Sequence, residues 1–118
     1  MSWPNEEFLK IASERGVIID VNDSVGKGWH ALVSRMFDEL IATGWDKRVS
    51  QIKEKFGTLR VYISDNQAGF QDIIDKYETL SATICEHCGE PGKTVSINYW
   101  MKTSCPEHTS VKAREWGN

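Results

Sequence analysis

Two short cysteine motifs near the C-terminus constrain the fold of this 118-residue chain more than any other feature. The first motif, Cys85-Glu86-His87-Cys88, has the spacing C-x2-C, and the second, Cys105-Pro106-Glu107-His108, has the spacing C-x2-H. Sixteen residues separate the two motifs, which together contain all three cysteines of the chain. This arrangement of sulfur and imidazole donors is typical of one tetrahedral Cys3His zinc site. We therefore predict that Cys85, Cys88, Cys105 and His108 bind one Zn2+ ion.

The number of predicted ligands indicates a structural zinc ion. Catalytic sites usually keep three protein ligands and leave the fourth position to water, whereas four protein ligands close the site. Structural zinc contributes about 10–16 kcal/mol of apparent binding free energy in small peptides near pH 7. We therefore expect the 85–108 segment to lose its order when the metal is removed. His87 lies inside the first motif, where it could compete as a ligand or make a supporting contact.

The spacing of apolar residues predicts an α+β fold. Helical periodicity covers three segments: 4–15, 29–41 and 67–82. Strand-like runs cover four segments: 17–21, 48–54, 58–64 and 95–99. Phe56-Gly57 lies at the bend between two of these runs, so a hairpin is expected. We predict helices packed on a small antiparallel sheet in a body formed by 1–84, with 85–118 forming a docked zinc ribbon or knuckle module and a tail.

The charges are distributed unevenly along the chain. The formal net charge of −3 gives no bulk attraction to nucleic acid, yet residues 47–60 hold five basic side chains against Glu54 alone. Strand alternation places Lys53 and Lys55 on one face, and Arg60 and Tyr62 follow on the next predicted strand. This surface could bind nucleic acid through phosphate contacts and base stacking, attract an acidic protein, or be a solvated sheet face.

The sequence contains no group of residues typical of an active site. A zinc deaminase needs an H-x-E element before P-C-x-x-C, and the chain has neither element. Gly26-Lys27-Gly28 lacks the spacing of a Walker phosphate loop, so a plain loop is expected. His30 lies at the edge of a helical apolar stripe, where a packing or surface residue is the usual case. We predict that the chain is not an enzyme.

Composition predicts a cytoplasmic protein. No apolar run approaches the roughly 18 residues that cross a bilayer, so no membrane association is expected. The N-terminus lacks the basic start and apolar stretch of a signal peptide. Because the metal motifs use all three cysteines, disulfides are not expected, and a reducing compartment follows.

Two motifs that occur together carry a family resemblance. The first is Gln51–Tyr62, with the sequence QIKEKFGTLRVY, and the second is Ile84–Gly92 followed by Cys105–His108. Over roughly residues 28–108 the chain resembles a family of small, uncharacterised bacteriophage and prophage proteins. Those proteins pair a KEKFG-LR-Y hairpin with a C-terminal CxxCG-PG and CxxH knuckle pair, although Thr58 stands here where a second glycine is expected. The resemblance implies zinc binding and an origin in a phage or prophage, and hence a bacterial host cytoplasm, but no catalytic residue.

Our leading hypothesis is a zinc-binding phage accessory protein that acts by binding a host or bacterial protein. Its sharpest form is the inhibition of a bacterial defence or regulatory factor. The acidic body and the five tryptophans favour a protein partner, and Trp100 near the metal motifs is a candidate interface anchor. The alternative is a nucleic-acid-binding zinc-ribbon module that uses the basic hairpin 47–60. A metal-assisted hydrolase ranks third, because it would need an open zinc position.

Overall fold

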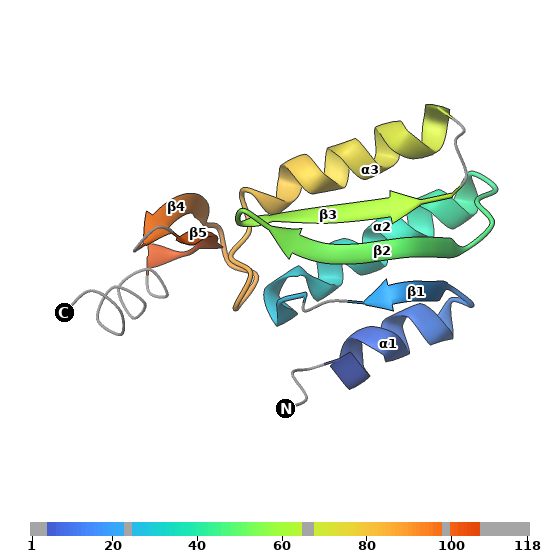
Figure 1. Cartoon of the computed structure of the whole chain (residues 1–118), viewed down its shortest axis with the longest axis horizontal. Helices are drawn as coiled ribbons and strands as arrows, with labels where there is room; N and C mark the ends of the chain where they lie inside the picture. The colour runs from blue at the N-terminus through green and yellow to red at the C-terminus, as the bar shows by residue number, and fades with distance from the viewer. Residues whose placement is uncertain (1–4, 23–24, 65–67, 98–99, 107–118) are drawn as a thin grey trace.

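The computed structural model describes residues 5–22, 25–64, 68–97 and 100–106, and its fold confirms the predicted α+β class (Figure 1). The elements in chain order are α1 (Asn5–Glu14), β1 (Ile18–Asn22), the 3-10 turn η1 (Lys27–Trp29), α2 (His30–Ala42), β2 (Arg48–Lys55), β3 (Thr58–Ile63), α3 (Ala68–Ser81), β4 (Lys93–Ile97) and β5 (Trp100–Ser104). Among the described residues, no helix is both long and apolar enough to cross a membrane. The predicted tail lies outside the described residues.

The main sheet has the order β1-β2-β3 and is mixed, which corrects the expectation of a purely antiparallel sheet. β2 and β3 form the predicted antiparallel hairpin, with Lys53 opposite Arg60. β1 pairs with β2 in parallel, because α2 lies between them in the chain and returns the backbone across the sheet. A second sheet consists of β4 and β5 in antiparallel pairing. The sequence predicted one strand in this region, over 95–99, and did not predict its partner.

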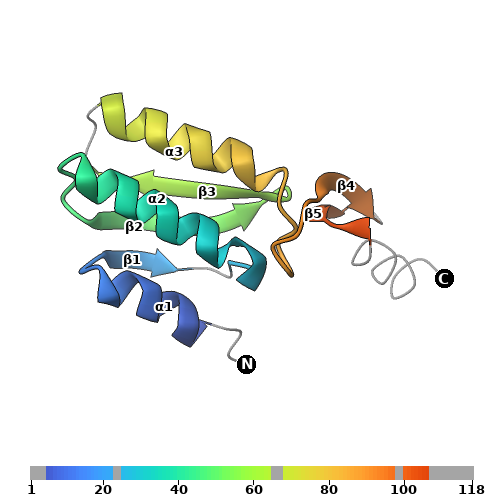
Figure 2. The same ribbon diagram turned by 180° about the vertical axis from the view of Figure 1, so that it is seen from behind.

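The core lies between α2 and one face of the three-stranded sheet. Figure 1 shows α2 behind β2 and β3, and Figure 2 shows it in front of them, so α2 covers a single face. Buried core side chains recur every three or four residues along α2: Leu32, Val33, Met36, Phe37 and Leu40. On β2 they are Val49 and Ile52, three residues apart across the register shift between Val49 and Gln51, and on β3 they are Leu59 and Val61, which alternate. No described helix lies over the opposite face of β2 and β3.

Helix α3 also protects the outer edge of the sheet. The backbone N–H of Leu59 donates to Ser81 Oγ at 2.9 Å, and that of Val61 donates to Glu78 Oε2 at 2.9 Å. Unpaired N–H groups on an edge strand would otherwise invite pairing with another chain. The β3 edge is therefore closed at these two positions. Burial raises the pKa of the Glu78 carboxyl, and the hydrogen bond from the Val61 N–H acts in the opposite direction.

The burial of His30 at the start of α2 makes the stability of the fold depend on pH. It is 8% exposed, its ring packs 5.4 Å from that of Phe8, and its Nε2 lies 3.3 Å from the Val25 carbonyl oxygen. Burial lowers the pKa of His30 below 6.5, and Lys27 acts in the same direction, while the Val25 carbonyl and Glu7 oppose them. A lowered pKa means that the folded state favours the neutral ring. The contribution of the neutral His30 ring to folding stability is therefore fully present above pH 6.5. It is lost as the pH falls through the folded-state pKa, where the buried ring must take up a proton.

This dependence can be measured by denaturant unfolding of the wild type and of His30→Gln. We expect the wild type to lose more stability than the variant between about pH 7.5 and pH 5.5, at equal zinc loading. The difference between the two pH profiles is the readout, because acid also protonates metal ligands in both proteins. Parallel plots of stability against pH for the two proteins would contradict a lowered pKa of His30 in the folded state.

Candidate metal centre

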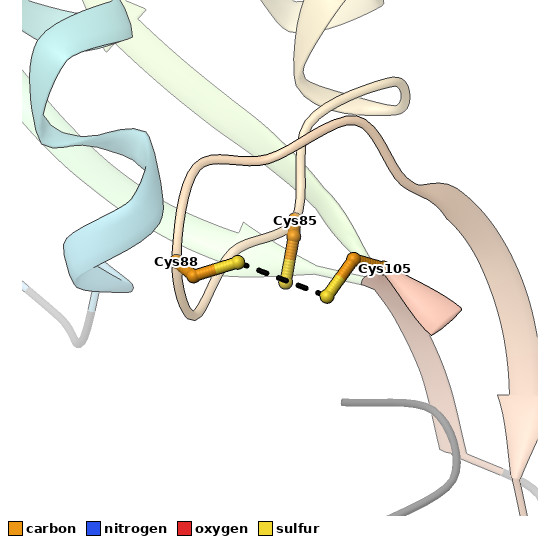
Figure 3. Close-up of side chains that lie close together, drawn as sticks. All are labelled: Cys85, Cys88 and Cys105. Atoms are coloured by element: carbon orange, nitrogen blue, oxygen red, sulfur yellow. Dashed lines mark hydrogen bonds between the residues drawn. The ribbon is translucent and has the colours of Figure 1, made fainter. Parts of the chain in front are cut away.

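Three cysteine sulfurs meet at the junction between α3 and the second sheet (Figure 3). Cys85 and Cys88 lie on the turn that follows α3, and Cys105 comes directly after β5. All three sulfurs lie within 4.8 Å of one another, and the Cys88 and Cys105 sulfurs are 3.7 Å apart. Zn–S bonds of about 2.3 Å in a tetrahedral site hold neighbouring sulfurs about 3.8 Å apart, which matches this distance. A disulfide would require about 2.05 Å. The cluster therefore fits a metal ion such as zinc.

The first pair of cysteines is held by a tight backbone turn. The N–H of Gly89 donates to the Cys85 carbonyl oxygen at 2.9 Å, and the Cys85 N–H donates to the Glu90 carbonyl oxygen at 2.8 Å. Gly89 has a φ of +82°, a conformation that a residue without Cβ adopts most easily. Cys85 and Cys105 are buried, whereas Cys88 is exposed. Two ligands thus approach from the protein interior and one from the surface.

The local electrostatics of the cysteines favour a bound cation. Burial tends to raise the pKa of Cys85, but backbone N–H groups of Cys105, His87 and Cys88 overcome it and lower the pKa to about 7. At Cys88 the Glu90 N–H lowers the pKa, whereas lost hydration and the sulfurs of Cys105 and Cys85 raise it, with a net value of about 11. Without a metal the clustered sulfurs therefore resist simultaneous ionisation. A divalent cation would remove this repulsion and stabilise the thiolates.

The described residues supply three of the four predicted ligands. His108 lies outside the described residues, so its role as the fourth ligand stays a prediction. His87 occupies the turn between Cys85 and Cys88, and its backbone N–H contributes to the hydrogen bonding of the Cys85 sulfur. The metal-compatible group within the described part of the chain consists of the three cysteines alone.

The Gly26-Lys27-Gly28 loop supports the first cysteine pair, a role that the sequence did not predict. The Gly28 N–H donates to the Glu86 carbonyl oxygen at 2.9 Å, and Trp29 Nε1 donates to the Ile84 carbonyl oxygen at 2.9 Å. A Cβ atom on Gly28 would lie 2.1 Å from the Cys85 carbonyl oxygen, so only glycine allows this approach. The sequence shows two glycines, one on either side of Lys27, but nothing near them in the chain indicates that this loop contacts the cysteine turn.

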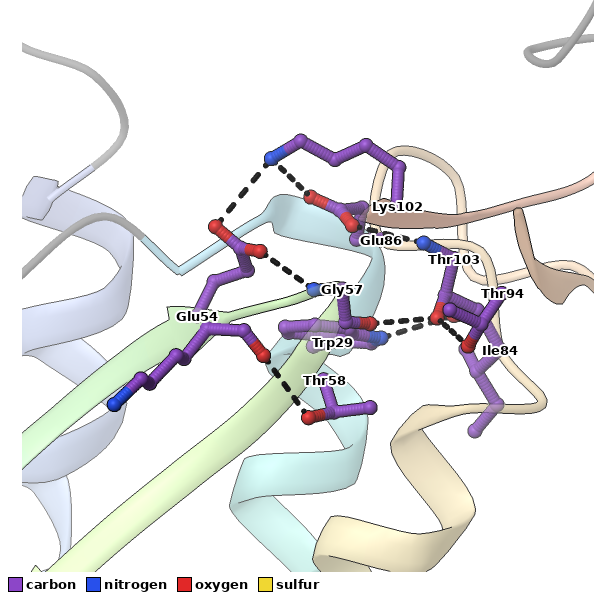
Figure 4. A network of polar contacts seen from close by, with 10 residues as sticks. Trp29, Glu54, Gly57, Thr58, Ile84, Glu86, Thr94, Lys102 and Thr103 are labelled. Carbon is purple, nitrogen blue, oxygen red and sulfur yellow. Dashed lines mark hydrogen bonds and ion pairs between the residues drawn. The ribbon is translucent and has the colours of Figure 1, made fainter. Parts of the chain in front are cut away.

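The tip of the β2–β3 hairpin contacts the second sheet through a polar network (Figure 4). Thr103 Oγ1 donates to the Gly57 carbonyl oxygen at 2.6 Å, and Thr103 is fully buried. Lys102 Nζ lies 3.4 Å from a carboxylate oxygen of Glu54 and 3.4 Å from one of Glu86. Burial raises the pKa of Glu86, and Lys102 opposes that effect. The KEKFG segment thus provides contacts between the body and the cysteine-bearing segment.

The predicted surface residues lie on or beside the hairpin. Lys53 is opposite Arg60 in the β2–β3 register, and Tyr62 is opposite Gln51. Tyr62 and Lys55 are exposed, whereas Lys53 and Arg60 are partly buried. Arg60 also lines a shallow hollow together with two acids of α3, Asp75 and Glu78. Trp100 begins β5, but its side chain lies outside the described residues.

No protein-family model, curated protein or solved structure matches the chain. The three sulfur donors and the contacts around them are therefore the basis for proposing a function. The phage or prophage origin and the division between 1–84 and 85–118 stay predictions from the sequence.

Proposed function

We propose that this chain is a non-catalytic binding protein in which one structural zinc ion fixes the C-terminal segment against the body. The observation that carries the proposal is the cluster of three cysteine sulfurs within 4.8 Å. Zinc prefers such sulfur ligands, and a sulfur-rich site with a fourth protein ligand leaves no position for a substrate. The ion would supply cross-linking between Cys85–Cys88 and Cys105, not chemistry.

The contacts around the cluster support a structural role. The cysteine turn touches the loop before α2 through Gly28, and β5 touches the hairpin tip through Thr103. Both contacts depend on the path of the backbone between Cys85 and Cys105, which the metal would fix. A zinc ion would therefore hold the hairpin tip and the second sheet in one fixed arrangement for a partner.

The expected partner class remains part of this proposal. The acidic body and the five tryptophans favour a host or bacterial protein as the partner, and the most specific form of this proposal is the inhibition of a bacterial defence or regulatory factor. Nucleic acid is the other partner class, and the residues that would bind it lie on the β2–β3 hairpin. The accessory role in a phage or prophage stays a prediction.

Metal analysis of protein purified under reducing conditions tests the proposal. We expect one zinc ion per chain, and we expect Co2+ exchanged into the site to give thiolate-to-metal charge-transfer absorption with tetrahedral ligand-field bands. His108→Ala should weaken zinc binding, whereas His87→Ala should leave the stoichiometry unchanged. A metal-free protein with ordinary folded-state protection over 85–106 would contradict a structural zinc ion.

A further inference from the structure

Phe56 at the hairpin tip has neither a favourable backbone conformation nor a buried ring. Its φ is +54° and that of Gly57 is +84°, so both residues of the two-residue turn are left-handed. Such turns favour Asn-Gly or Asp-Gly, because a left-handed backbone costs free energy in a residue with a large side chain. The Phe56 side chain is nevertheless 64% exposed. Neither turn geometry nor core packing explains an aromatic residue here, and such departures often mark a functional surface.

A lysine accompanies each of the two exposed aromatic rings of the hairpin. Lys55 Nζ lies 5.5 Å from the centre of the Phe56 ring, and Lys53 Nζ lies 5.9 Å from the centre of the Tyr62 ring. Tyr62 is 45% exposed. The hairpin therefore carries two ring–lysine pairs, Phe56 with Lys55 at the tip and Tyr62 with Lys53 further along the strands. Each pair consists of one aromatic ring and one ammonium group.

The face that carries the lysines is basic because the neighbouring acid points the other way. Strand alternation puts Lys53, Lys55 and Tyr62 on the side of the sheet that no described helix covers (Figure 1). Glu54 lies between the two lysines in sequence but accepts a hydrogen bond from the Gly57 N–H and pairs with Lys102. Arg60 is opposite Lys53 and lies on the same face, but the acids Asp75 and Glu78 of α3 line the same hollow as its side chain, so Lys53 and Lys55 are the cations available to a ligand.

We propose that this hairpin face binds single-stranded nucleic acid, with bases stacked on Phe56 and Tyr62 and phosphates close to Lys53 and Lys55. A nucleotide offers one aromatic surface and one negative charge, which matches the composition of each ring–lysine unit. An acidic peptide would satisfy the lysines but would not require two exposed rings. The acidic remainder of the chain restricts binding to a short stretch of strand.

The inference rests on the proposed function for one element, the fixed position of the hairpin tip. Gly57 next to Phe56 contacts β5 through the Thr103 hydroxyl, and a Cβ on Gly57 would lie 3.1 Å from the Lys102 Cα. A zinc-ordered second sheet would thus hold the tip in place.

Binding of nucleic acid should weaken as salt is added. Neutralisation of one phosphate by each of the two lysines gives a slope of log K against log salt of about −1.4, because single strands give about −0.7 for each neutralised phosphate.

Fluorescence anisotropy with the zinc-loaded full chain tests the inference. The probes are labelled single-stranded DNA and RNA of mixed sequence and about 12 nucleotides, a length within the range that one small domain contacts. We expect Phe56→Asn to weaken binding at least about five-fold through the lost stacking, while its zinc content is unchanged and its thermal stability equal or higher. Lys53→Gln with Lys55→Gln should weaken binding and flatten the salt slope. Lys10→Gln removes one exposed charge from α1 and serves as the control that leaves binding unchanged.

The outcomes separate the inference from the proposed function. Zinc-loaded protein that binds neither oligonucleotide at low salt, or that binds a labelled polyglutamate peptide instead, would overturn the inference and leave the zinc proposal intact. Equal affinity of the wild type and the Lys53→Gln/Lys55→Gln double variant, or preference for a duplex of the same sequence, would overturn it as well. Oligonucleotide binding by a chain that holds no zinc would support the hairpin face and contradict the structural metal.

Discussion

Replacing Cys85 with serine is expected to abolish stoichiometric zinc binding and to disorder the segment from 85 to 106. Cys85 is fully buried and its sulfur belongs to the three-cysteine cluster, and a serine hydroxyl is a poor zinc ligand at neutral pH. Structural zinc sites contribute about 10–16 kcal/mol of apparent binding free energy, which exceeds what a few hydrogen bonds of about 1 kcal/mol each can replace. The second sheet, with two short strands, is too small to be stable alone.

The expected loss is confined to one part of the chain. The buried apolar cluster is formed by the three helices and the β1-β2-β3 sheet, so hydrogen exchange in α2 should stay slow in Cys85→Ser. Exchange in β4 and β5 should approach that of an unfolded peptide. Ser96→Ala, a change at an exposed residue of β4, is the control and should keep one zinc ion per chain. Full zinc occupancy with unchanged protection of β5 in Cys85→Ser would refute a metal-dependent segment.

Local sequence patterns predicted the parts of the molecule that depend on local geometry. The α2 stripe repeats over several turns, and Gly44 with a φ of +96° follows the helix as expected. The hairpin was evident because its two alternating runs flank Phe56-Gly57. The metal ligands of the first motif were evident for the same reason, since two intervening residues let one turn aim both sulfurs at one ion.

Non-local pairing was the part that the sequence could not reveal. The short run at 18–22 has the composition of a strand but contains nothing that specifies parallel pairing with β2. Trp29 and Ile84 form a hydrogen bond although they are 55 residues apart, and no periodicity connects them. The charge pattern predicted a basic strip, and strand alternation predicted that Lys53 and Lys55 share a face, but nothing in the sequence indicates that Glu54 pairs with Lys102, 48 residues away.

A methyl group at Gly28 is expected to displace the first cysteine pair from the body. The Cβ of Gly28→Ala would lie 2.1 Å from the Cys85 carbonyl oxygen and 2.8 Å from the Cys88 N. These are backbone atoms of the metal-binding turn, so no side-chain rotation can relieve the collision. Steric overpacking usually costs about 1–3 kcal/mol, and the rigid neighbours place this variant at or above the upper end. Zinc affinity should fall with it, because the turn that positions Cys85 and Cys88 must move.

Gly69→Ala is the matched control for this prediction. Gly69 lies in the first turn of α3, and a Cβ there would meet no heavy atom within 4 Å. Because alanine favours a helix over glycine by up to about 1 kcal/mol, Gly69→Ala should be neutral or slightly stabilising. Urea unfolding and competition for zinc with a chelator, measured on both variants, distinguish the two glycines. Equal unfolding midpoints and equal zinc affinities would mean that the cysteine turn does not rest on the Gly26–Gly28 loop, and that the metal centre is held by β5 alone.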